Sequence, residues 1–151
     1  MKRKIDLGLK LTENFTLREF VESPTAMRLG IDNTPQWKHV LAMISLCRNV
    51  LQPLRDHIGR PLLINSGYRC EQLNEAVHGV GRSQHLLGEA ADLHIRHVEE
   101  GRKYYDFILT HCTFDQLLFE YNRFGAVWIH VSCKQETLKN RHMALPNYHV
   151  R

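Results

Sequence analysis

Cysteine is scarce in this chain of 151 residues, and no two cysteines lie close together in the sequence. The four cysteines are Cys47, Cys70, Cys112 and Cys133. None of them forms the Cys-x-x-Cys pattern of thiolate zinc sites, and their wide spacing does not indicate a dense disulfide framework. We therefore expect reduced, mostly buried thiols rather than a thiolate zinc site.

Long apolar runs are also missing, because no stretch approaches the roughly 18 to 20 apolar residues that a membrane span needs. The basic segment MKRKIDLGLKLTENF is not followed by an apolar run of signal-peptide length or by a small-residue cleavage site. We therefore expect no membrane span and synthesis in the cytoplasm. Action on a cell wall would then need a separate route of release.

Low-complexity tracts and blocks of like charge are absent as well. Hydrophobic residues make up 43% of the sequence and charged residues 24%, which is typical of a globular protein. We expect one domain over residues 1–151, and a monomer. The net charge of +4 is spread over scattered lysines and arginines. Since no basic stripe or recognition-helix pattern is visible, we expect no nucleic-acid partner.

Apolar spacing and turn signals predict a mixture of helices and strands. A capping box formed by Thr16 and Glu19 predicts one helix start, and the pair Thr34-Pro35 predicts another. The expected longer helices cover about 37–54 and 98–109, and helical spacing also runs through Leu73, Ala76 and Val77. The expected strands cover 62–65, 91–95, 114–120 and 127–133. The order favours the α+β class, with a central, largely antiparallel sheet flanked by helices.

The stretch SQHLLGEAADLHI predicts a loop, Ser83 to Glu89, that leads into a short strand. His85 and Asp92 in this stretch are two candidate metal ligands. A catalytic zinc needs three protein ligands and one open position, and His130 in the strand WIHVS offers the third. The spacing alone also allows His94 or His78 as a ligand, and it allows Asp92 to be a structural strand residue.

Two further polar residues suit a hydrolytic site. Glu120 ends the strand that precedes the one bearing His130, so a hairpin would bring it near as a general base. It also fits an ordinary exposed acid at a strand end. Arg69 follows the first strand of the predicted sheet and suits bidentate binding of a substrate carboxylate, although pairing with Glu71 or Glu75 is equally compatible with the sequence. Trp128 by itself favours core packing over a substrate wall.

Together these segments resemble a known family. SGYRCEQLNEAVHGVGRSQHLLGEAADLHI is similar to the hallmark of the zinc D-alanyl-D-alanine carboxypeptidases and peptidoglycan endopeptidases, SGYR followed by Ser-x-His-x-x-Gly-x-Ala-x-Asp. The matching positions are Ser83, His85, Gly88, Ala90 and Asp92. Trp128-x-His130 matches the second metal-binding segment. FDQLLFEYNRFGAVWIHVSCK also resembles the signalling domain of hedgehog proteins, which shares this fold.

The resemblance covers about Phe15 to Lys134 and implies a hedgehog/DD-peptidase-like fold. It implies a zinc ion, with His85, Asp92 and His130 as ligands and a zinc-activated water as nucleophile. Glu120 would be the catalytic base, and Arg69 and Ser83 would bind the substrate. His94 would lie behind the ligands or contact the substrate. The implied substrate is a D-amino-acid-containing stem peptide of peptidoglycan, as for a carboxypeptidase or a phage endolysin.

One position departs from the family pattern. Many members carry an acidic base three residues before the last histidine, where this sequence has Val127. Glu120 must then act across the hairpin. A non-catalytic zinc-bearing binding or signalling module on the same scaffold is the alternative function.

Overall fold

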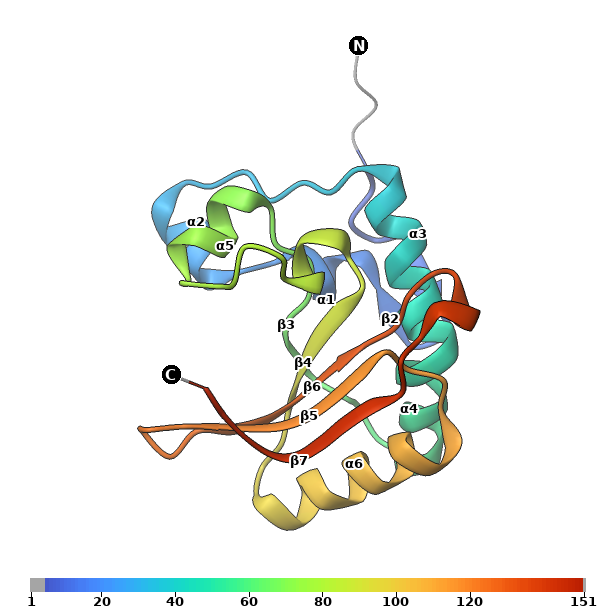
Figure 1. Ribbon diagram of the computed structural model, residues 1–151. Helices are drawn as coiled ribbons and strands as arrows, with labels where there is room; N and C mark the ends of the chain where they lie inside the picture. The colour runs from blue at the N-terminus through green and yellow to red at the C-terminus, as the bar shows by residue number, and fades with distance from the viewer. Residues whose placement is uncertain (1–4, 151) are drawn as a thin grey trace.

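The computed structural model describes residues 5–150 and is built around a five-stranded sheet with the strand order β3-β4-β6-β5-β7 (Figure 1). Its strands are β3 (Ile64–Ser66), β4 (Ala90–His94), β5 (Gln116–Asn122), β6 (Val127–Ser132) and β7 (Met143–Val150). Neighbouring strands are antiparallel, except that β7 runs parallel to β5. A small second sheet pairs β1 (Lys10–Thr12) with β2 (Phe15–Thr16). This architecture confirms the predicted α+β class.

Helices surround the sheet, and short-range sequence signals explain where several begin and end. The helical segments are α1 (Leu17–Val21), α2 (Pro24–Leu29), α3 (Trp37–Leu46), the π-helical turn η1 (Cys47–Leu51), α4 (Gln52–Ile58), α5 (Glu71–Ala76), α6 (Val98–His111) and the 3-10 turns η2 (Gln84–Leu87) and η3 (Thr137–Lys139). The predicted capping box begins α1, where the Glu19 carboxylate accepts a 2.7 Å hydrogen bond from the Thr16 backbone N–H. No helix within residues 5–150 is long and apolar enough to cross a membrane.

The long helix predicted for residues 37–54 continues to Ile58 as α3, η1 and α4. Pro53 lies in the first turn of α4, directly after the π-helical turn. A proline has no N–H to donate, and the altered hydrogen-bonding of a π-turn accommodates it inside a continuous helix. Gly59 ends the helix with a left-handed backbone, at a φ of 69°.

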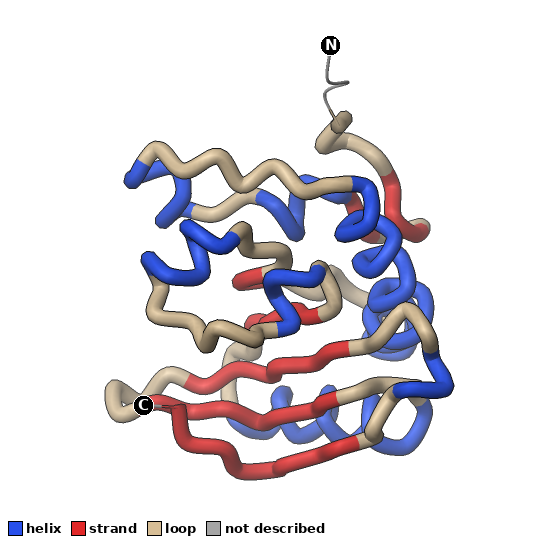
Figure 2. Tube along the Cα trace, turned by 45° about the horizontal axis from the view of Figure 1, so that its top comes forward, coloured by secondary structure: helices blue, strands red, loops and turns tan. Residues whose placement is uncertain are grey.

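The main core lies where the sheet packs against the helices (Figure 2). Leu117 and Phe119 of β5 are buried on the face of the sheet that meets α6. Gly101 allows α6 to come this close, because a Cβ there would lie 2.7 Å from the Phe119 ring. Strand side chains alternate between the two faces, so Leu118 and Glu120 point to the opposite side. The sheet therefore has an apolar face toward α6 and a second face free to build a site.

The closing segment, for which the sequence suggested no structure, forms the edge strand β7. Its entry is tied down by the buried carboxylate of Asp115, which accepts hydrogen bonds from the backbone N–H and the guanidinium of Arg141. Met143 then donates its backbone N–H to the carbonyl oxygen of Asp115. These contacts place β7 beside β5.

Candidate metal centre and cleft

The 3-10 turn η2 positions His85. The Ser83 hydroxyl accepts a hydrogen bond from the His85 backbone N–H at 3.2 Å, and Gly88, at a φ of 77°, closes the turn before β4. The His85 Nδ1 lies 2.7 Å from the carbonyl oxygen of Gly67. A carbonyl only accepts, so Nδ1 carries a proton and Nε2 is the ring nitrogen left for a metal. Nε2 is 3.3 Å from the Asp92 Oδ1.

The sheet register places Asp92 and His130 together, because they are direct partners in the antiparallel pair β4–β6. The His130 Nδ1 is 2.9 Å from the Asp92 Oδ1. Burial alone would raise the pKa of Asp92, but the imidazoles of His85 and His130 outweigh it and hold the pKa well below its ordinary value. The aspartate is therefore ionised, as a metal ligand must be.

One ligand atom from each of His85, Asp92 and His130 lies within 4.8 Å of the other two. Within residues 5–150 this trio is the only such cluster of histidine, cysteine and acidic side chains. Two imidazole nitrogens and one carboxylate oxygen suit zinc, and the backbone contact of His85 is the outer support that metal-binding histidines commonly have. The residues present therefore fit a zinc ion.

The two alternative histidines lie outside this cluster. His94 is exposed and pairs with Trp128, two positions along β4 and β6 from the pair of Asp92 and His130. His78 is exposed after α5, where its backbone adopts a left-handed φ of 59°. Asp92 does belong to a strand, but its carboxylate faces the two imidazoles.

Glu120 lies on the same face of the sheet, in the row next to His130. It pairs with Trp128 across β5–β6, whereas His130 pairs with Leu118. Its side chain is only 9% exposed, so it is not an ordinary exposed acid. Burial raises the pKa of Glu120 to about 7, and His130 limits the rise. A carboxyl group with a pKa near 7 can both accept and release a proton at neutral pH.

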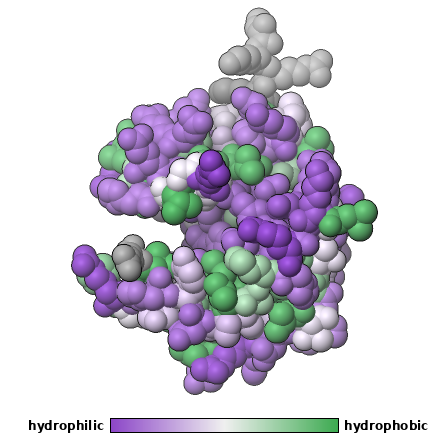
Figure 3. All heavy atoms as spheres, viewed as in Figure 1, coloured by the Kyte–Doolittle hydropathy of each residue, from purple (hydrophilic) through white to green (hydrophobic). Residues whose placement is uncertain are grey.

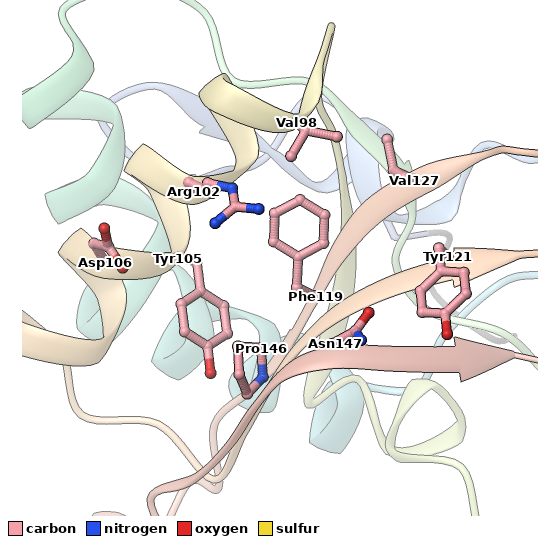
Figure 4. Close-up of a pocket in the computed structure, with 9 residues that line it drawn as sticks. All are labelled: Val98, Arg102, Tyr105, Asp106, Phe119, Tyr121, Val127, Pro146 and Asn147. Atoms are coloured by element: carbon pink, nitrogen blue, oxygen red, sulfur yellow. The ribbon is translucent and has the colours of Figure 1, made fainter.

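Val127, the position at which the resemblance described above would place an acid, faces away from this group. It lines a pocket of about 560 Å³ between the sheet and α6, together with Tyr105 and Phe119 (Figure 4). A carboxylate at position 127 with this backbone would point toward α6. Glu120 is therefore the acidic side chain that β5 and β6 present to the cluster.

Two buried hydrogen-bond donors beside the cluster lack partners. They are the Nε of Arg69 and the indole Nε1 of Trp128. Arg69 forms no ion pair with Glu71 or Glu75, the two acids with which the sequence allowed it to pair. Buried donors normally find a partner. The Arg69 Nε is therefore available to a ligand, whereas the Trp128 indole N–H lies close enough to the Glu120 carboxyl to lower its pKa.

All these groups line one cleft of about 830 Å³, which the space-filling view shows as a hollow in the side of the molecule (Figure 3). The cleft includes Ser83, Arg69, Glu120 and the cluster, and its volume lies in the range of about 300–1,000 Å³ usual for small-ligand sites. The sequence did not indicate that β7 closes one side, through residues that include Leu145 and Tyr148.

The family model for peptidase M15 matches residues 13–132 of the chain. A search of the curated proteins finds no match. The matched region includes the whole His-Asp-His cluster, Glu120 and Arg69, and it confirms the resemblance carried by the SGYR and SQHLLGEAAD motifs. M15 peptidases depend on zinc, in agreement with the candidate metal site. With most of its length matched, this chain belongs to the peptidase M15 family.

Proposed function

We propose that this protein is a zinc-dependent peptidase that hydrolyses D-amino-acid-containing stem peptides of peptidoglycan, as a carboxypeptidase or an endopeptidase. The observation that carries the proposal is the position of Glu120, a buried carboxyl with a pKa of about 7, on the same sheet face as the candidate metal ligands. A structural zinc site needs no such group beside it. A hydrolytic site does.

Zinc bound by His85, Asp92 and His130 would supply Lewis acidity, which lowers the pKa of water and polarises a carbonyl group. Glu120 has the complementary role of moving the proton. Its ionised carboxylate accepts a proton from the attacking water. It then donates this proton to the nitrogen of the leaving amine, which returns the carboxylate to its starting state. In the metal-free protein the pKa of Glu120 is about 7, so this buried carboxyl can hold or release a proton near neutral pH.

Arg69 and Ser83 are proposed to bind the substrate. The buried, unpartnered Nε of Arg69 is a charged donor suited to a peptide carboxylate, and the indole N–H of Trp128 is a second donor nearby. The Ser83 hydroxyl accepts from the His85 backbone, and its own O–H is still free to donate. Stem peptides carry several carboxylates, which matches this group of donors. The D configuration is proposed from the family resemblance.

The test is a metal analysis combined with a cleavage assay. Purified protein is measured for zinc by plasma mass spectrometry and incubated with peptidoglycan and its soluble stem peptides. We expect near one zinc per chain and newly released amines. Both should be lost in His85→Ala. The matched control is His94→Ala, which changes a histidine of the adjacent strand that lies outside the cluster.

Glu120→Gln separates catalysis from metal binding. It should keep zinc and fold but lose nearly all of the rate, because glutamine cannot accept the proton. Stoichiometric zinc without cleavage of any peptide would instead favour a non-catalytic zinc-bearing module. A protein that takes up no metal after reconstitution would refute the site.

A further inference from the structure

The edge strand β7 lies outside the residues that the M15 family model matches, 13–132, yet it flanks the proposed base. It pairs with β5, and Tyr148 is the direct partner of Glu120 in this parallel pair. The side chains of Leu145 and Tyr148 both line the cleft of the candidate metal centre. The part of the chain that the family pattern does not describe therefore forms one wall of the proposed active site.

A β-bulge explains how two side chains three positions apart reach the same cleft. Leu118 pairs with Leu145 and Glu120 with Tyr148, so two residues of β7 face the single residue between them on β5. In a regular strand Leu145 and Tyr148 would point to opposite faces. The extra residue of the bulge resets this alternation, and both side chains face the cleft.

The two residues inside the bulge have the opposite orientation. Pro146 and Asn147 line the pocket against α6 with Phe119, on the far side of the sheet from the cleft (Figure 4). Pro146 has no N–H to contribute to a sheet, and a bulge in an edge strand is where a proline is tolerated. Because of the bulge, Leu145 and Tyr148 face the cleft, whereas Pro146 and Asn147 between them face α6.

The cleft-facing pair is large and partly open to solvent. Leu145 is 39% exposed and Tyr148 is 42% exposed, beside a carboxyl that is almost fully buried. A substrate that covered these two side chains would remove apolar surface from water. Tyr148 also lines the cleft beside Glu120, the proposed base, so its phenol ring takes up part of the space there.

We propose that Leu145 and Tyr148 are specificity-determining residues that contact the substrate residue next to the cleaved bond and restrict it to a small aliphatic side chain such as that of alanine. The proposal rests on the function proposed above for the same cleft. It assigns to β7 the choice of substrate, whereas the cluster and Glu120 carry the chemistry.

The test compares pairs of stem peptides that differ only in carrying alanine or leucine, of one configuration, beside the tested bond. The wild type should prefer alanine in kcat/KM. Tyr148→Ala should raise the leucine-to-alanine ratio by about tenfold or more, the size expected from changing one apolar contact in a pocket. Tyr148→Phe should keep the wild-type ratio, because the ring rather than the hydroxyl restricts the space.

Asn147→Ala is the matched control, since it changes the neighbouring residue of the same strand on the opposite face. It should leave the ratio within twofold of the wild type. Zinc content and melting temperature are measured for every variant, so that a distorted site is recognised. An equal shift of the ratio in Asn147→Ala would overturn the proposal.

A binding measurement distinguishes this proposal from the proposed function. The same peptides are titrated by calorimetry into zinc-loaded Glu120→Gln, with and without Tyr148→Ala. If the wild type cleaves no peptide but Tyr148→Ala relaxes the binding preference, the peptidase function fails and the role of β7 stands. Unchanged preferences in cleavage and binding, or binding of none of the peptides, would refute the role of β7.

Discussion

Replacing Glu120 with glutamine is expected to stabilise the metal-free protein at alkaline pH, even though it abolishes catalysis. The wild-type carboxyl is 9% exposed, and its burial raises the pKa from 4.5 to about 7. Folding at high pH must therefore bury a charge that the unfolded chain keeps in water. Glutamine has nearly the same shape and carries no charge, so the variant avoids this cost at any pH.

The sign and size follow from the two pKa values. Below pH 4.5 the carboxyl is protonated in both states and costs nothing. As the pH rises toward 7 the folded state holds more protons than the unfolded state, so stability falls with pH. One pH unit of separation between the pKa values is worth about 1.4 kcal/mol, which gives a full penalty of about 3 kcal/mol above pH 7. Most of this penalty accrues between pH 5 and pH 8.

The assay is urea unfolding of chelator-treated wild type and Glu120→Gln at pH 5 and pH 8. Between pH 5 and pH 8 the unfolding free energy of the variant should rise relative to that of the wild type by about 2 to 3 kcal/mol. Glu13→Gln, which changes an exposed acid, serves as the control. Added zinc should narrow the gap, because a nearby cation stabilises the carboxylate. A difference that does not change with pH would refute the claim that burial perturbs Glu120.

Further predictions concern the supports of the site. Zinc at 100 times its dissociation constant should raise the unfolding free energy by about 2.7 kcal/mol in the wild type and not in His85→Ala, as measured by urea unfolding. Gly67→Ala should lower the unfolding free energy by roughly 1–3 kcal/mol, because the new Cβ would lie 2.7 Å from the Phe20 Cα. Zinc titration should also show weaker binding by this variant, since the Gly67 carbonyl orients His85. Arg141→Ala should cost about 2 kcal/mol at pH 7, the half-exposed arginine limiting the loss. Burial raises the pKa of Asp115 but Arg141 outweighs it, so this stabilisation should fade as the pH falls below about 4, and acid titration of both proteins would reveal it.

The parts of the site that could be predicted from the sequence are those built by short-range rules. Ser83 and Gly88 bracket a turn, and the alternating strand after it faces Asp92 to one side. Alternation also fixes the register of a half-buried strand, because a slip by one residue would turn its apolar side chains to solvent. This is why Asp92 meets His130, although 38 positions separate them.

Other features depend on packing that no local pattern reports. The sequence shows Glu120 only as an acid at the end of a predicted strand. In the structure β5 lies between β6 and β7, and Glu120 is buried. Arg69 lies near two acids in the sequence, yet its Nε is buried without a partner. The helix predicted for about 37–54 continues past Pro53 to Ile58, since the π-helical turn before the proline accommodates its missing N–H.

The strand β7 could not be predicted from the sequence, for a physical reason. A bulge interrupts the two-residue period, so Leu145 and Tyr148 lie three apart and match neither a strand nor a helix pattern, and Pro146 between them argues against a strand. The bulge that hides the strand is also what turns both side chains into the cleft. Because the ligands and the base are held by η2, β4, β6 and β5, we expect changes in β7 to alter what the cleft admits while these elements keep the groups that carry the chemistry in place. Proteins with the same His-Asp-His cluster can therefore differ in substrate through this one edge strand.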